Sequence, residues 1–133
     1  MTMKPKQILL IDDSDIDNFI NKSVLSKCVI ADSILIETSA IVALQYLHKM
    51  MDDLENFPDI IFLDIRMPEM DGFEFLEEYI KIPEYIQQKC DIFILSSSID
   101  PKDVEKAQQY KAVKKHLTKP LTQDLLESIL VCV

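Results

Sequence analysis

One segment, Asp59-Ile60-Ile61-Phe62-Leu63-Asp64, constrains the fold of this 133-residue chain more than any other. Its four central residues are all apolar and lack the alternation that a strand with one face in water shows. A strand of this kind is buried on both faces, as the central strands of parallel sheets are. The segment therefore predicts an α/β domain whose sheet is covered by helices on both sides.

Short apolar runs alternate with helical patterns along the rest of the chain. Further strands are predicted at 7–11, 34–36, 92–95 and 113–118, and helices at 15–29, 39–51, 73–83, 101–111 and 122–131. The first helix has amphipathic spacing, and we expect Pro83 to end the third; the apolar positions of the first are Ile16, Phe19, Ile20, Val24 and Cys28. Five strands and five helices in alternation predict a doubly wound, flavodoxin-like parallel sheet of order 2-1-3-4-5, although the pattern alone does not prove that order.

Composition narrows the classes of function. The chain has 14 basic and 23 acidic residues, a formal net charge of −9, which disfavours direct binding to nucleic acid or an anionic membrane. No apolar run approaches the ~18 residues of a membrane span, and none near the N-terminus is long enough for a signal peptide. The cysteines Cys28, Cys90 and Cys132 are far apart and form no C-x-x-C pair, so we expect reduced thiols. We expect a cytoplasmic protein with a single domain over residues 1–133.

Chemistry-bearing residues stand where the predicted strands end. Asp12 and Asp13 follow the first strand, Asp64 the third, Ser96 the fourth and Lys119 the fifth. The ends of parallel strands share one edge of the sheet, so these side chains converge there. Two carboxylates ~4 Å apart repel by roughly 4 kcal/mol at an effective dielectric constant near 20, which calls for positive charge. Lys119 supplies one charge, and oxygen ligands favour Mg²⁺, or Mn²⁺, over zinc as the source of more.

Three motifs together carry a family resemblance. The segment Phe62-Leu63-Asp64-Ile65-Arg66-Met67-Pro68-Glu69-Met70-Asp71-Gly72 closely resembles the phosphorylation-site region of bacterial two-component response regulator receiver domains. The Asp12-Asp13 and Lys119-Pro120 pairs match the same family at the right distances. The resemblance covers about residues 6–131 and is to single-domain, chemotaxis-regulator-like members.

The resemblance implies a role for each matched residue of the acidic site. Asp64 is the implied phosphoacceptor, which takes a phosphoryl group from a histidine kinase or a histidine phosphotransfer protein. Asp12 and Asp13 are implied to hold Mg²⁺, with the Asp64 carboxylate and the backbone carbonyl of Arg66 as the remaining protein ligands. Lys119 is implied to pair with the phosphoryl oxygens as a point charge.

Two further positions are implied to transmit the signal. Ser96 occupies the switch position whose hydroxyl moves to bond the phosphoryl group, and Pro120 stands where the family commonly has a cis Lys-Pro bond. The second switch position, on the fifth strand, is usually Tyr or Phe. Here it is His116, which is either a surface residue without a role or a switch whose coupling varies with pH.

Other departures from the family pattern have ordinary explanations. Ala112 replaces the glycine that often precedes the fifth strand, so we expect that turn to be built differently. Ser14, Asp15 and Asp17 resemble further metal ligands, but acidic residues at a helix start complement its dipole. We therefore interpret these three residues as helix capping.

The leading hypothesis is a signalling module that is no enzyme beyond promoting its own Mg²⁺-dependent phosphotransfer and dephosphorylation. Phosphorylation would bias the 4-5-5 face (fourth helix, fifth strand, fifth helix) toward binding a downstream protein, in a monomer or a weak dimer through that face. One alternative is a phosphorylation-independent scaffold on the same fold. Another is a nucleotide- or cofactor-binding enzyme, but Gly72 is the only glycine, which excludes a G-x-G-x-x-G turn and a P-loop.

Overall fold

A parallel sheet forms the centre of the molecule. The structure, a computed structural model, describes residues 5, 7–29, 31–97 and 99–130. The strands are β1 Gln7–Ile11, β2 Ser33–Glu37, β3 Ile60–Leu63, β4 Asp91–Ser96 and β5 Val113–Thr118. They pair in parallel in the order β2-β1-β3-β4-β5, which confirms the predicted topology.

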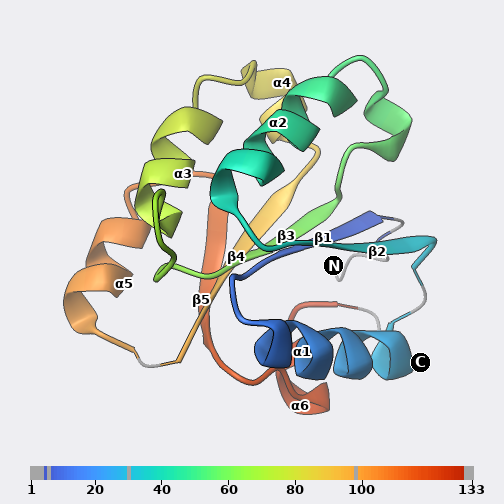
Figure 1. Cartoon of the computed structure of the whole chain (residues 1–133), viewed down its shortest axis with the longest axis vertical. Coiled ribbons are helices and arrows are strands. Elements are labelled where there is room, and N and C mark those ends of the chain that lie inside the picture. The colour runs from blue at the N-terminus through green and yellow to red at the C-terminus, as the bar shows by residue number, and fades with distance from the viewer. Residues whose placement is uncertain (1–4, 6, 30, 98, 131–133) are drawn as a thin grey trace.

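Helices cover both faces of this sheet (Figure 1). They are α1 Asp15–Cys28, α2 Ala40–Met50, α3 Gly72–Tyr79, α4 Glu84–Gln87, α5 Pro101–Ala107 and α6 Gln123–Glu127, with a 3-10 turn at Leu54–Asn56. Helices α2, α3, α4 and α5 lie on one side of the sheet, and α1 and α6 lie together on the other. In the described part of the chain, no helix has the length and apolar character needed to cross a membrane.

The prediction of five helices was wrong by one. Pro83 does not merely follow the third helix: it is the N-cap of the short helix α4, with φ −51° and ψ 138°. The new helix presents Gln87, whose side-chain amide donates to the carbonyl oxygens of Ile80 at 3.1 Å and Ile82 at 2.6 Å. These carbonyls follow the end of α3, so α4 satisfies acceptors that a plain loop would leave to water.

The core consists of two apolar layers, one on each side of the sheet. Side chains alternate along each strand, so Ile61 and Leu63 join one layer while Ile60 and Phe62 join the other. All four are at most 1% exposed, which confirms that β3 is buried on both faces. Burial of this kind stabilises the fold and leaves the strand ends as the place where polar groups can gather.

Helix α1 packs differently from its predicted amphipathic pattern. Ile16, Phe19 and Ile20 are 73%, 74% and 39% exposed. Of the predicted apolar positions, Cys28 is buried and Val24 packs partly buried against the core, while the other buried residues of the helix are Asn18, Asn21 and Leu25. The first half of α1 lies against the polar loops at the carboxyl edge of the sheet, and its inward side chains are those that can bond those loops.

The turns near β5 also differ from expectation. Helix α5 ends at Ala107, four residues before the predicted end at Lys111. The turn closes through backbone bonds from Tyr110 to Ala107 and from Val113 to Tyr110, both 3.0 Å, and Ala112 has no positive φ. Glycine is therefore not needed at Ala112. Helix α6 ends at Glu127 rather than near Val131, which lies outside the described residues, as do residues 1–4 of the predicted domain.

The two cysteines in the described part of the chain are free thiols, as expected. Cys28 and Cys90 are buried and free. Burial raises the pKa of the Cys90 thiol far above its usual range, so this thiol is not a nucleophile at neutral pH. Cys132 lies outside the described residues.

Candidate functional site

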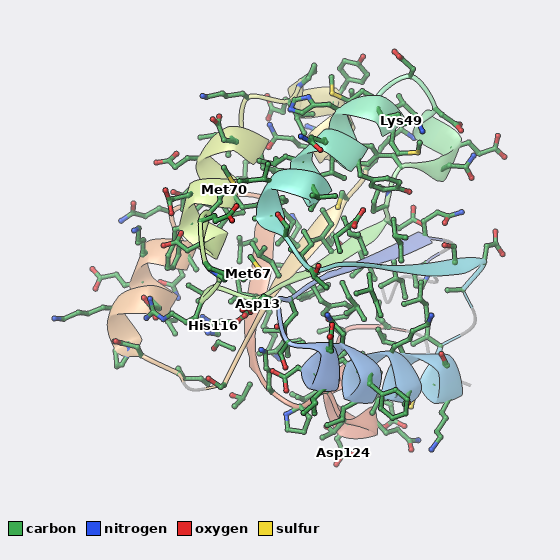
Figure 2. All side chains as sticks on the ribbon, in the orientation of Figure 1. Asp13, Lys49, Met67, Met70, His116 and Asp124 are labelled. Carbon is green, nitrogen blue, oxygen red and sulfur yellow. The ribbon has the colours of Figure 1, made fainter. Side chains whose placement is uncertain are left out.

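The predicted site residues do meet at the carboxyl edge of the sheet. The backbone amide of Asp12 donates to Glu37 at 3.2 Å, and that of Asp64 donates to Ile11 at 2.9 Å, so both aspartates continue the hydrogen bonding of their strands. Figure 2 shows Asp13 and His116 at this end of the molecule, the end at which the chain leaves β1 and enters α1. The topology therefore fixes where these side chains start.

Three carboxylates form the centre of the site. One oxygen from each of Asp12, Asp13 and Asp64 lies within 4.8 Å of the other two. Asp12 and Asp64 are buried, at 4% and 5% exposure, whereas Asp13 is exposed. Backbone amides brace the buried pair: that of Ser14 donates to Asp12 Oδ1 at 2.9 Å, and that of Arg66 donates to Asp64 Oδ1 at 3.4 Å.

The electrostatics of this group single out Asp64. Burial is the largest influence and raises the pKa of the Asp64 carboxyl from 3.8 to about 6, with further repulsion from Asp12 and Asp13. Lys119 and the Arg66 amide act in the opposite direction without restoring the usual pKa. A divalent cation bound between these oxygens would relieve the repulsion, and an all-oxygen donor set with one solvent-facing member suits a hard cation that keeps several waters. The residues present therefore fit a metal site.

Lys119 is held among these carboxylates. Its Nζ lies 2.6 Å from Asp12 Oδ2, 2.9 Å from Asp17 Oδ2 and 3.6 Å from Asp64 Oδ1. Burial by itself lowers the pKa of the Lys119 ammonium, but the contacts with Asp12 and Asp17 and the charge of Asp64 outweigh it and raise that pKa. Lys119 is thus a permanent positive charge beside Asp64.

The capping interpretation of the start of α1 was correct for Ser14 and Asp15 and incomplete for Asp17. Ser14 is the N-cap, and its hydroxyl accepts from the Asp17 amide at 3.2 Å. Asp15 stands in the first turn, as the helix dipole favours. Asp17 stands in that turn too, but its carboxylate reaches across to Lys119, 102 residues away. No local pattern reveals this contact.

The two predicted switch residues contact each other. Ser96, 5% exposed, ends β4, and its Oγ lies 2.8 Å from Nε2 of His116 on the neighbouring strand. The Nδ1 atom of His116 is buried without a hydrogen-bond partner in the described part of the chain. Burial lowers the pKa of this imidazole, and the nearby charge of Asp103 partly offsets the effect. His116 is therefore half-buried and in contact with the other predicted switch residue. Its role as a switch stays a prediction.

The loop after β3 packs tightly against the acceptor residue. A methyl group added at Gly72 would lie 2.7 Å from the Asp64 carbonyl oxygen and 2.8 Å from Ile65 Cα, so glycine is required by close approach. The Gly72 amide donates to the Ile65 carbonyl at 2.8 Å, and Asp71 with Glu74 forms a capping box at the start of α3. This loop therefore holds Asp64 by its backbone.

Two buried asparagines tie α1 to the site loops. The Asn18 side-chain amide donates to the Asp12 carbonyl at 2.8 Å, and Asn21 Oδ1 accepts from the Leu121 amide at 3.0 Å. Leu121 follows the cis peptide bond between Lys119 and Pro120, the bond that the family resemblance implied. Sequence reasoning missed both asparagines, although their spacing with Leu25 and Cys28 is helical.

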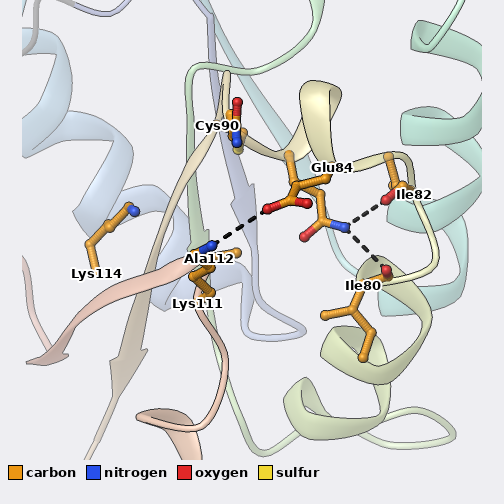
Figure 3. Close-up of a pocket in the computed structure, with 9 residues that line it drawn as sticks. Ile80, Ile82, Glu84, Cys90, Lys111, Ala112 and Lys114 are labelled. Carbon is orange, nitrogen blue, oxygen red and sulfur yellow. Dashed lines mark hydrogen bonds and ion pairs between the residues drawn. The ribbon is translucent and has the colours of Figure 1, made fainter.

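A cavity of about 340 Å³ lies elsewhere, at the start of β4 and β5 (Figure 3). Its lining includes Ile80, Ile82, Cys90 and Lys111, and the Lys111 ammonium lies 3.5 Å from a Glu84 carboxylate oxygen. The parallel strands run from this end toward the carboxylates, so the cavity is separate from the acidic site.

Comparison with known proteins agrees with the site geometry. Residues 8–131 match the model of the response regulator receiver domain family. The chain belongs to this family. Receiver domains are the signalling domains of response regulators in two-component systems, so this chain is a signalling domain rather than a conventional enzyme.

The match to this chain covers a different share of each relative's own length. The response regulator Rcp1 of Synechocystis sp. is 30% identical over 102 residues, which are 75% of this chain and 67% of Rcp1. The chain spans only 54% of the two-component response regulator ORR1 of Oryza sativa subsp. indica and 14% of the sensor histidine kinase CheAY of Helicobacter pylori.

Solved structures confirm the fold. A two-component response regulator from Cytophaga hutchinsonii superposes with a TM-score of 0.87 at 32% identity, covering 95% of this chain and 94% of that one. The Mn²⁺-bound form of Rcp1 has a TM-score of 0.72 at 28% identity, covering 93% of this chain and 88% of that one. The flavodoxin-like arrangement predicted from the sequence is thus confirmed.

Proposed function

We propose that this receiver domain accepts a phosphoryl group on Asp64 from a phosphohistidine of a histidine kinase or a histidine phosphotransfer protein. The observation that carries the proposal is the Asp64 carboxylate itself, buried at a strand end between Asp12 and Lys119. With a pKa of about 6 this group is mostly ionised at neutral pH, as a nucleophile must be. A carboxylate oxygen attacks phosphorus, the phosphorus–nitrogen bond breaks, and its electron pair stays on the imidazole that leaves.

The protein groups around Asp64 would bind the metal ion and stabilise the charge of the entering phosphoryl group. Mg²⁺, or Mn²⁺ in its place, would be held by Asp12, Asp13, the Asp64 carboxylate and the Arg66 backbone carbonyl. When bound, the cation screens the negative charge of Asp64 and of the entering phosphoryl oxygens. Lys119 offers a further positive charge 3.6 Å from Asp64 Oδ1, close enough to bond a phosphoryl oxygen attached there.

The output signal is proposed to start at Ser96. An aspartyl phosphate brings about −1.5 to −2 charges and three acceptor oxygens to the site. The Ser96 hydroxyl turns to donate to one of them and releases its 2.8 Å contact with His116. His116 lies on β5, so its movement alters the face made by α5, β5 and α6, which corresponds to the predicted 4-5-5 face. We propose that a downstream protein reads this face.

One experiment tests the acceptor assignment without a partner protein. The native chain is incubated with acetyl phosphate and Mg²⁺, and its intact mass is measured beside that of the Asp64→Asn variant. We expect one added phosphoryl group on the native chain, dependent on Mg²⁺, and none on the variant. An unmodified native chain, or equal modification of both, would remove Asp64 from the role.

The assembly state has its own test. We propose that residues 1–133 act as one receiver unit that is a monomer or forms a weak dimer through the α5–β5–α6 face. Size-exclusion chromatography with and without the phosphoryl analogue BeF₃⁻ measures this directly. A tight dimer that is insensitive to BeF₃⁻ would contradict it.

A further inference from the structure

The contact between Asp17 and Lys119 is not part of the chemistry proposed above. Asp17 stands in the first turn of α1, whereas Lys119 follows β5. The Asp17 side chain is 37% exposed, and the Lys119 side chain is 11% exposed. A helix-dipole role would be fulfilled by any acidic residue of that turn, and it would not require a contact with Lys119.

Asp17 is a second carboxylate partner of the Lys119 ammonium, and it lies on a different element from Asp12. Asp12 Oδ2 is nearer to the ammonium, at 2.6 Å, and holds it from the end of β1. Asp17 Oδ2 accepts a hydrogen bond from the same ammonium at 2.9 Å, from the first turn of α1. An ammonium has three N–H groups in fixed mutual directions, so directing one of them toward Asp17 restricts where the other two point.

Space around the ammonium makes that restriction matter. Asp17 and Lys119 border a cavity of about 200 Å³ that is also lined by Ile20, Ser97 and Pro120. The flexible lysine stem has room to move on that side. The bond to Asp17 holds the ammonium at the edge of this cavity, with its Nζ 3.6 Å from Asp64 Oδ1.

We propose that Asp17 is a positioning residue, which orients the Lys119 ammonium so that one N–H group is directed to the phosphoryl group entering at Asp64. This inference rests on the proposed phosphoacceptor function. Asp17 acts through Lys119 and makes no contact with the reacting atoms. What it contributes is an acceptor atom in the right place, so a neutral acceptor of the same shape performs the same task.

The chain offers a matched set of variants. Asp17→Ala removes the acceptor and the charge, whereas Asp17→Asn keeps an acceptor oxygen and removes only the charge. Asp15→Ala removes an equal charge from the same helical turn without touching Lys119. Acetyl phosphate serves as the donor because it needs no docking surface, and the rate of Asp64 phosphorylation is followed with saturating Mg²⁺.

We expect Asp17→Ala to slow phosphorylation roughly 5-fold, while Asp17→Asn and Asp15→Ala stay within about 2-fold of the native rate. A rate unchanged or raised in Asp17→Ala, or an Asp17→Asn variant as slow as Asp17→Ala, would overturn the positioning role. Equal slowing by Asp15→Ala would mean that the helix dipole explains the effect, and it would overturn the positioning role as well.

A second measurement separates this inference from the proposed function. The Lys119 ammonium ¹H–¹⁵N signal, assigned by its loss in Lys119→Arg, is recorded without Mg²⁺ or phosphodonor. It should persist in the native chain and in Asp17→Asn, and weaken in Asp17→Ala through faster exchange with water. An unchanged signal in Asp17→Ala refutes the inference even if Asp64 is phosphorylated. A native chain that acetyl phosphate does not modify refutes the proposed function, and a signal weakened in Asp17→Ala then still shows that Asp17 holds the Lys119 ammonium.

Discussion

Replacing Asp64 by asparagine should stabilise the fold at neutral pH. The Asp64 carboxyl has a pKa of about 6 in the folded protein, against 3.8 for an unperturbed group, because it is buried and lies beside Asp12. Without solvent screening, this difference in pKa corresponds to about 3 kcal/mol in the free energy of unfolding. Because the site opens to water at the exposed Asp13, solvent screening reduces the value, and we expect about 1–2 kcal/mol.

The pH dependence of this effect has a definite sign. Well below pH 3.8, Asp64 is protonated in the folded and the unfolded chain, and its burial carries no ionic penalty. As the pH rises from 3.8 to the folded-state pKa of about 6, the unfolded chain loses its proton first and the native fold loses stability from this group. The Asp64→Asn variant lacks that loss, so its advantage should be small at pH 4 and full at pH 7.5.

Urea unfolding of the metal-free chains in EDTA measures the difference. Native chain and variant are compared at several pH values between 4 and 7.5, with Asp52→Asn as a control that removes an exposed carboxylate. The control should follow the native chain within about 0.5 kcal/mol. A variant no more stable than the native chain at pH 7.5, or an advantage that does not change with pH, would refute the reasoning.

Three further predictions follow from single contacts. Gly72→Ala should destabilise the fold by about 1–3 kcal/mol and slow phosphorylation, because the new methyl group would displace the Asp64 backbone. A free energy of unfolding in urea within about 0.5 kcal/mol of the native value would contradict this. Asn21→Ala should cost about 1–3 kcal/mol, because it leaves the buried Leu121 amide without its acceptor, whereas Lys22→Ala on the exposed side of α1 should cost little. The His116 imidazole should titrate below pH 6.5 by NMR, because burial disfavours its charged form, and a midpoint above 6.5 would contradict its buried contact with Ser96.

The sequence predicts the sheet well because its signal is local. The unbroken apolar residues of β3 require burial on both faces, and the structure shows that burial. The convergence of Asp12, Asp64 and Lys119 follows from topology alone, since parallel strands end at one edge. Residues separated by more than 50 positions can therefore be grouped from the sequence alone.

The predictions from the sequence failed where a contact joins residues that are distant in the sequence. Helix α1 shows apolar spacing at Ile16, Phe19 and Ile20, but the structure buries Asn18 and Asn21 because the Asp12 carbonyl and the Leu121 amide need partners. Local hydrophobicity carries no information about those partners. The same holds for Asp17, whose role in the first turn of a helix is visible while its bond to Lys119 is not.

The most direct test of the proposed function is to find the residue to which a phosphoryl group attaches. After acetyl phosphate and Mg²⁺ treatment, borohydride reduces an aspartyl phosphate to homoserine, which marks the modified residue permanently. Peptide mass spectrometry of the reduced protein should find homoserine at Asp64, with Asp12, Asp13 and Asp17 unchanged. Homoserine at any of those three residues instead, or at none of the four, would contradict the account.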